Sequence, residues 1–136
     1  SSTAIECAKE KAVQTGIKSR FFVSDLTEVS LTLADEYQVI IDGNCLHCII
    51  GNDRSTVLNH IYKALESDGI FFVSSLCSKD NHNHQILRDG IPYRHIASMD
   101  NLVAELKNNG FSLLKTVLYE RQDHNHITVQ AIKRKQ

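Results

Sequence analysis

The sequence has no tryptophan, a single proline and a single methionine, and only six glycines. No apolar run approaches the roughly 18 residues of a membrane-spanning helix, and no signal-peptide pattern is present. The net charge is −1, and the only local basic run is the tail 133–135. Attraction to phosphates therefore gives no support for nucleic-acid binding. We expect neither a membrane nor a nucleic acid as a partner.

Cysteine is present, but without the spacing of a disulfide-stapled scaffold. Cys45 and Cys48 flank His47, which suggests half of a zinc site. A strong zinc site needs a second pair at a comparable spacing, and here only loops from opposite ends of the chain could supply one, with His82, His84, His124 and His126. We therefore predict no metal site. We interpret Cys45 and Cys48 as buried strand-end thiols and all four cysteines as reduced and cytoplasmic.

The 136 residues, 42% of them hydrophobic, fit one domain with a core of its own. The periodicity of apolar residues predicts alternating helices and strands. The expected elements are a helix over 3–16, a strand over 21–25, a helical turn within 27–35, a strand over 37–41, a helix over 53–68, a strand over 70–76, a loop over 77–97, a helix over 98–110 and a β-hairpin over 111–133 with its turn at 122–125. This alternation favours an α/β fold with a mainly parallel sheet and an antiparallel edge.

Helix boundaries follow from capping residues. Thr3 with Glu6 predicts a capping box, and Gly16 predicts a left-handed end to the same helix. Asp53 and Ser98 are the expected N-caps of the two later helices. The 77–97 stretch is polar, with one glycine and the only proline. A loop this long is usually functional or contains a short helix, which we place at 85–88.

The most informative stretch is YQVIIDGNCLHCIIGNDR, residues 37–54. An apolar strand ends on Asp42 and Gly43, a short loop with a Leu-His pair follows, and a helix begins. In an open α/β sheet, ligands bind in the crevice beyond the carboxyl ends of the strands. The stretch therefore predicts part of a ligand site.

The order of these elements and their junctions resembles the class I S-adenosylmethionine-dependent methyltransferases. FFVSDL is similar to that family's third strand with its acidic end, and YQVIIDGNCLHCI to its fourth strand with the Leu-His pair. The run from RSTVLNHIYKAL through ESDGIFFVSSL is similar to its helix, L-x-P-G-G turn and fifth strand, although Ser67 and Asp68 replace the usual Pro and first Gly. The resemblance implies a Rossmann-like three-layer sandwich with an incomplete seven-stranded sheet, strands 3 to 7 of the order 3-2-1-4-5-7-6. That sheet would be mainly parallel with a C-terminal antiparallel hairpin.

The resemblance also shows what is absent. The family binds its cofactor through a Gly-rich loop after the first strand and an acid after the second, yet the sequence has no Gly-x-Gly, and the acid would lie just before Ser1. We therefore expect a partial domain, with 1–76 a remnant of the cofactor-binding half, 77–97 a loop over the acceptor site, and 98–136 a helix plus hairpin. Strands 21–25 and 37–41 would lose their neighbours, so we expect their edges to pair with each other or to form a homodimer.

Several site residues are implied by the resemblance. Asp25 would accept a hydrogen bond from the adenine of S-adenosylmethionine, with Leu26 beside the ring, and a strand-end Asp that caps the next turn is the alternative. Asp42 and Gly43 would face the amino-acid part of the cofactor, and here the alternative is a simple turn.

Three further residues are candidates for the acceptor side. His47 could act as a general base near the acceptor, although in the family the Leu-His pair more often packs the start of the next helix. Tyr93 and Arg94 fall in the segment that often covers the acceptor, so they are candidates for substrate binding.

The leading hypothesis is methyl transfer from S-adenosylmethionine to a small-molecule acceptor by the intact protein, with weak or no activity in this chain. One alternative is a non-catalytic, truncated domain that acts by association or dimerisation. A thiol and histidine metal-binding module is the other.

Overall fold

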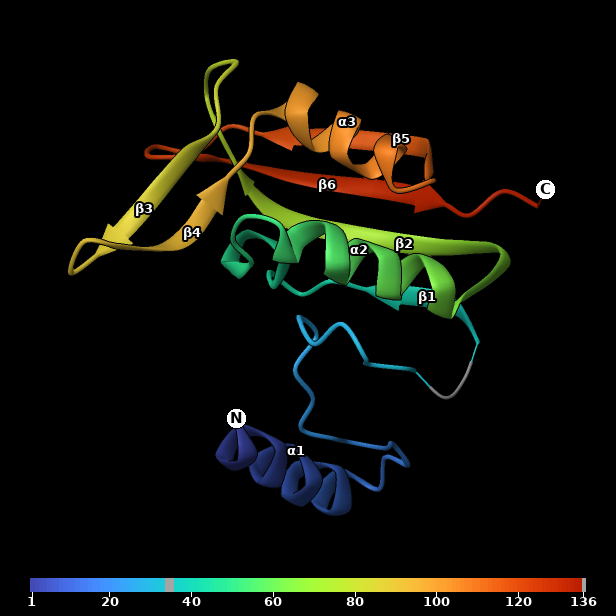
Figure 1. Cartoon of the computed structure of the whole chain (residues 1–136). Helices are drawn as coiled ribbons and strands as arrows, with labels where there is room; N and C mark the ends of the chain where they lie inside the picture. Colours follow the sequence, from blue (N-terminus) through green and yellow to red (C-terminus); the bar gives the residue numbers. More distant parts are fainter. Residues whose placement is uncertain (34–35, 136) are drawn as a thin grey trace.

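The computed structural model describes residues 1–33 and 36–135. Its centre is a four-stranded sheet in the order β1-β2-β6-β5 (Figure 1). The strands are β1 (Tyr37–Ile41), β2 (Leu65–Cys77), β5 (Ser112–Tyr119) and β6 (Asn125–Ile132). Only β1 and β2 run parallel, because β6 returns antiparallel between β2 and β5. The α/β class and the terminal hairpin are confirmed, whereas the expectation of a mainly parallel sheet is wrong.

Two helices, α2 (Asp53–Ala64) and α3 (Met99–Asn108), cover one face of this sheet (Figure 1). Alternate residues of the central strand, such as Phe71 and Val73, are buried beneath them against Leu58 and Leu106. This burial of apolar area is the main stabilising contribution to the fold. The residues that alternate with these on β2 point to the opposite face of the sheet and stay half-buried, namely Ile70, Phe72, Ser74 and Leu76. Among the described residues no helix covers that second face, so the expected three layers are two.

The N-terminal helix α1 (Ser2–Thr15) lies apart from the sheet (Figure 1). Its fourteen residues, all described, include none that is buried. The helix is capped by Ser1, whose Oγ accepts the N–H of Ala4 at 3.3 Å, rather than by Thr3 as the capping box predicted. The predicted left-handed end at Gly16 is confirmed by its φ of 70°.

The predicted strand at 21–25 is not formed, although all five residues are described. Phe22 and Val23 are 64% and 62% exposed. A strand needs a neighbour to accept and donate its backbone hydrogen bonds, and no strand lies beside this segment in the described structure. In place of the helical turn predicted within 27–35, two single turns form. In these the N–H of Glu28 donates to the carbonyl of Asp25, and the N–H of Leu31 donates to the carbonyl of Glu28. The last two residues of the prediction lie outside the described residues.

The 77–97 segment contains a hairpin rather than a loop with a helix at 85–88. Strands β3 (His84–Arg88) and β4 (Ile91–Ile96) pair antiparallel. Asp89 and Gly90, at φ 51° and 76°, form the turn between them. Asp-Gly is a strong signal for such two-residue turns, because both positions need positive φ. Asp89–Gly90 is therefore the sequence signal for this hairpin, and the predicted helix at 85–88 is wrong.

The remaining boundaries shift by a few residues. Asn52, not Asp53, precedes α2, and the helix ends at Ala64 rather than at 68 because β2 begins at once. Ser98 caps α3 as predicted, accepting the N–H of Asn101 at 3.2 Å. The closing turn of the 111–133 hairpin lies between β5 and β6, which confirms that prediction.

Candidate functional site

The carboxyl end of β1 carries a buried acid. Asp42 is 7% exposed, and its backbone N–H donates to the carbonyl of Phe72 on β2 at 2.8 Å. Its two carboxylate oxygens accept the backbone N–H groups of Cys45 at 2.6 Å and Leu46 at 3.1 Å. Asp42 thereby holds the short 3-10 helix η1 (Leu46–Cys48) against the end of the strand.

Burial raises the pKa of Asp42 above the ordinary 3.8 for aspartate, because the charged form loses water. The two backbone N–H donors and the charge of Arg54 oppose this rise. The carboxylate therefore caps the loop through its two hydrogen bonds, and its pKa also responds to the charge of Arg54.

Gly43 leaves an opening next to this acid. A Cβ built on Gly43 would meet no described atom within 4 Å. Asn44 follows in a left-handed conformation with φ 66°. The loop therefore exposes its backbone at Gly43, and a ligand could approach the chain closely there.

His47 lies in η1 and is 4% exposed. Its Nδ1 accepts the backbone N–H of Leu76 at 3.3 Å. Strand β2 continues to Cys77 after its last pairing with β1 at Phe72, so the imidazole satisfies an N–H that β1 does not reach. With Nδ1 occupied as an acceptor, the neutral ring carries its proton on Nε2.

The pKa of His47 lies below the ordinary 6.5, first because of burial and then because of the charges of Arg94, His126 and Arg54. At neutral pH the ring is therefore uncharged, with Nε2–H as a donor. A general base would need a free lone pair, and in this tautomer His47 does not offer one.

Arg54 was not identified from the sequence, although it organises the site. Its Nε and Nη2 donate to the two carboxylate oxygens of Glu105 on α3 at 2.7 and 2.8 Å. Its Nη1 donates to the carbonyls of Leu46 at 2.6 Å and Ile49 at 3.2 Å. This buried guanidinium joins both helices to the loop that carries His47.

Tyr93 and Arg94 lie on β4, which packs against η1. The guanidinium carbons of Arg88 and Arg94 lie 4.7 and 5.5 Å from the centre of the Tyr93 ring. Arg94 Nη1 also lies 3.8 Å from Cys48 Sγ. The structure thus brings Arg94 into contact with the loop beyond Asp42.

Asp25 is exposed and accepts hydrogen bonds from Thr27, at 2.9 Å from its N–H and 2.7 Å from its hydroxyl. These bonds lower the pKa of Asp25. Leu26 is half-buried. Within the described residues no hydrogen bond links Asp25 to the loop beyond β1, and its bonds to Thr27 match the alternative interpretation of an acid that caps the next turn.

The expected strand-end burial of two cysteines is wrong, since Cys45 and Cys48 are exposed and only Cys77 is buried. No cluster of three or more histidine, cysteine or acidic side chains that could hold a metal occurs among the described residues. No described helix is long and apolar enough to span a membrane.

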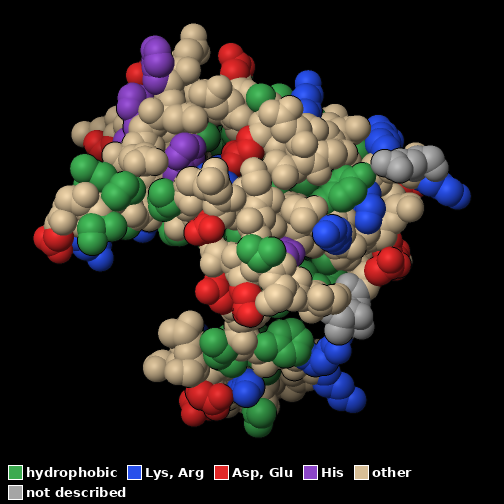
Figure 2. All heavy atoms as spheres, viewed as in Figure 1, with side chains coloured by type: hydrophobic (Ala, Val, Ile, Leu, Met, Phe, Trp, Pro, Cys, Tyr) green, Lys and Arg blue, Asp and Glu red, His purple; other side chains and the backbone are tan. Residues whose placement is uncertain are grey.

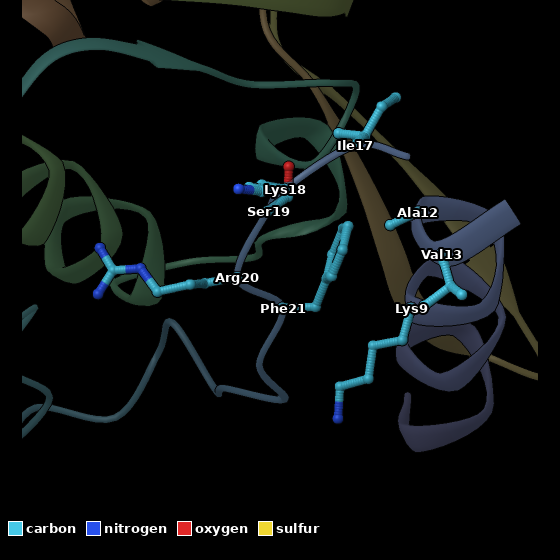
Figure 3. Close-up of a pocket in the computed structure, with 8 residues that line it drawn as sticks. All are labelled: Lys9, Ala12, Val13, Ile17, Lys18, Ser19, Arg20 and Phe21. Carbon is cyan, nitrogen blue, oxygen red and sulfur yellow. The ribbon is translucent and has the colours of Figure 1, made fainter. Parts of the chain in front are cut away.

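The cavities lie elsewhere. One of about 560 Å³ lies between α1 and the segment after it, where Phe21 points toward Ala12 and Val13 (Figure 3). Another of about 460 Å³ lies between α2, α3 and the β3–β4 hairpin, beside the Arg54–Glu105 pair. Neither is lined by Asp42, Gly43 or His47. Geometry at the carboxyl end of β1, and not cavity volume, identifies the candidate site, and we call the region beyond this strand end the crevice.

A second histidine near the crevice was also missed. His126 at the start of β6 is half-buried and pairs across the strands with Leu76. Its Nε2 lies 2.8 Å from the hydroxyl of Ser74. The sequence placed this histidine in a turn, and only the register of β6 brings it to this end of the sheet.

No protein-family profile matches the sequence, and no curated protein matches it. Solved structures do share its fold. A 1,6-didemethyltoxoflavin-N1-methyltransferase from Burkholderia thailandensis, solved with 1,6-didemethyltoxoflavin and S-adenosylhomocysteine, is 19% identical with a TM-score of 0.78 over 93% of this chain and 56% of that chain. An S-adenosylmethionine-dependent methyltransferase from Methanosarcina mazei is 13% identical with a TM-score of 0.81, covering 100% of this chain and 80% of that chain.

The cyclase SpnF is 14% identical with a TM-score of 0.78 over 98% of this chain and 64% of that chain. The fold is therefore that of the class I S-adenosylmethionine-dependent methyltransferases, as the resemblance implied. This chain spans little more than half the length of the first of these neighbours. Because one neighbour is named a cyclase, the fold alone does not decide the reaction.

Proposed function

We propose that this chain is part of an S-adenosylmethionine-dependent methyltransferase that acts on a small-molecule acceptor. The observation that carries the proposal is the Asp42–Gly43 loop, a buried acid followed by an open glycine at the carboxyl end of β1. In support, the strand order β1-β2-β6-β5 agrees with the 4-5-7-6 part of the order that the resemblance implies.

The residues present fit part of such a cofactor. The open space over Gly43 suits close backbone approach, and the carboxylate of Asp42 lies beside it for the amino-acid portion. Asp25 and Leu26 remain the candidates for the adenine, and they would have to approach the crevice from a segment that is not part of the sheet. When bound, the cofactor supplies an electrophilic methyl group, and the protein contributes alignment and exclusion of water.

A small-molecule acceptor is supported by the neighbour that binds 1,6-didemethyltoxoflavin. Arg94 lies on β4 in contact with Cys48 of η1, and from there it would contact an acceptor bound at the end of β1. Tyr93 is proposed to act by holding the guanidinium of Arg94 through its ring face.

We expect this chain to bind the cofactor weakly, because none of its six glycines forms a Gly-x-Gly loop. The test is calorimetric titration with S-adenosylhomocysteine, comparing the wild type with Gly43→Val. The valine fills the open space over the loop, so weak binding should be lost while the circular dichroism spectrum is unchanged. Binding that Gly43→Val leaves intact would contradict the assigned site. Micromolar binding to the wild type would contradict only the expectation that this chain binds the cofactor weakly.

Association is the second candidate function, and the exposed β1 supports it. Val39 and Ile41 are 49% and 74% exposed, and β1 pairs with β2 on one edge only among the described strands. A free apolar edge favours pairing with another chain. Sedimentation should then show dimers that Ile41→Lys dissociates. A monomer at all accessible concentrations, with no binding of S-adenosylhomocysteine to detect, would contradict both candidates.

A further inference from the structure

One donor in the crevice is unused. The His47 side chain is 4% exposed, and its Nδ1 is occupied by the N–H of Leu76. Its Nε2–H has no partner among the described residues. Among the described residues, the side-chain nitrogen that is buried from solvent and lacks a hydrogen-bond partner is Nδ1 of His95. Because Nε2 of His47 is not in this class, it is accessible to solvent. A ring whose Nδ1 is held by Leu76 and whose Nε2–H faces solvent can donate to a ligand without reorientation.

A cation without a carboxylate lies next to it. The described ion pairs include none between Arg94 and an acidic side chain. Its Nη1 instead contacts the sulfur of Cys48, the residue after His47, at 3.8 Å. Arg54, by contrast, is bonded in parallel to both oxygens of Glu105. Arg94 therefore retains its capacity for a bidentate bond to an anion.

His126 completes the group from the other side of Leu76. It pairs with Leu76 across β2 and β6, while the N–H of Leu76 donates to His47. Its Nε2 is held by Ser74 at 2.8 Å, which orients the ring. The charges of Arg94 and His126 both lower the pKa of His47, as expected for side chains that lie close together. We call His47, Arg94 and His126 the donor cluster.

The charges around the donor cluster leave it positive. Glu105 is paired with Arg54, and the carboxylate of Asp42, although it keeps its charge, accepts backbone N–H groups and, among the described residues, no hydrogen bond from the donor cluster. No carboxylate contributes to the pKa shift of His47. The site therefore offers donors and positive charge without a compensating acid.

We propose that the donor cluster binds an anionic oxygen group, so that the acceptor is an organic acid. The identification of this anion as the methyl acceptor rests on the proposed function, whereas the binding of an anion does not. Arg94 supplies the charge, and the neutral Nε2–H of His47 supplies a fixed donor.

The test uses benzoate as the probe and benzamide as its uncharged match, without cofactor. Imidazole and guanidinium resonances are followed by NMR during titration of the 136-residue chain. Benzoate should shift the resonances of His47 and Arg94, whereas benzamide should not. Arg94→Met should weaken benzoate binding by about tenfold, because a hydrogen bond to a charged group is lost.

Two variants sharpen the result. His47→Asn keeps an oxygen that can accept the N–H of Leu76 but removes the Nε2–H donor, so it should weaken benzoate while leaving the fold intact. Arg88→Met is the matched control, because Arg88 also lies over Tyr93, whereas the hydrogen bond to Cys48 of η1 comes from Arg94. Equal binding of benzamide, or equal losses in Arg88→Met and Arg94→Met, would overturn the proposal.

The outcome is separable from that of the proposed function. Benzoate binding with no affinity for S-adenosylhomocysteine would keep the anion site and count against methyl transfer. Affinity for S-adenosylhomocysteine without a response to benzoate would keep the methyltransferase proposal and remove the organic acid.

Discussion

Arg54 and Glu105 join α2 to α3 through two parallel hydrogen bonds of 2.7 and 2.8 Å. The arginine side chain is 5% exposed and the glutamate side chain 20%. Since Arg54 also donates to the carbonyls of Leu46 and Ile49, it connects the helical layer with the crevice loop. Stability and site geometry are therefore coupled through one guanidinium.

Glu105→Gln should lower the free energy of unfolding by about 3 kcal/mol, because the guanidinium is left buried without its counter-charge. Urea denaturation monitored by circular dichroism measures the change. Glu120→Gln, at an exposed position after β5, is the control and should change stability by less than about 0.5 kcal/mol. Equal unfolding curves for the two variants would contradict the assigned role of the pair.

Gly69→Ala should destabilise the chain by about 1–3 kcal/mol through overpacking. Its Cβ would lie 2.9 Å from the carbonyl oxygen of Glu66 and 3.0 Å from that of Tyr37, and backbone atoms do not yield easily. Gly43→Ala is the matched control, since its Cβ meets no described atom within 4 Å. Thermal unfolding of both variants provides the comparison, and a midpoint for Gly69→Ala no lower than that for Gly43→Ala would show that the turn adapts.

Stability should fall as the pH drops below about 6.5, the ordinary pKa of histidine. The pKa values of His47 and His95 lie below the ordinary 6.5, in both cases chiefly because of burial. The unfolded chain then binds more protons than the folded one, so stability is present above 6.5 and is lost as the pH falls toward the folded pKa values. Urea midpoints across this range should depend less on pH in His47→Asn. An unchanged pH dependence would mean that His47 titrates normally.

Asp80 should titrate with a pKa of about 2. The N–H of His82, the hydroxyl of Ser78 and the ring of His84 all favour its charged form. Histidine side chains gather at this end of the molecule (Figure 2). Because the folded pKa is lowered, this contribution to stability is present above 3.8 and is lost as the pH falls through about 2.

Carboxylate NMR titration of wild type and Ser78→Ala measures this pKa, which should rise in the variant as one donor is removed. A wild-type value near 3.8 would show that these hydrogen bonds are not formed in solution.

Periodicity and caps were sufficient to predict β1, the start of α3 and the final hairpin. They failed at 21–25, where the apolar run FFV indicated a strand, because a strand depends on a neighbour that local sequence does not specify. They also failed at 85–88, where the charged and polar flanks obscured the Asp89–Gly90 turn signal. Local patterns thus predict elements, while pairing decides which of them form.

The candidate site was predicted as far as the acid and glycine that end β1. His47 was recognised, with a general base and packing against the next helix as the two interpretations. Its tautomer could not be predicted, because it depends on the N–H of Leu76, 29 residues away. Arg54 and His126 were missed, since their partners Glu105 and Ser74 are 51 and 52 residues distant. A single sequence does not reveal such separations.

The last strand, β6, lies in the interior of the sheet between β2 and β5. It contributes Ile127, Val129 and Ala131 to the core. Its pairs with β2 join residues far apart in the sequence, from Cys77 with Asn125 to Ile70 with Ile132. Closing so long a loop costs chain entropy before the contacts form, so we expect this pairing, rather than the local β3–β4 and β5–β6 hairpins, to limit the rate of folding.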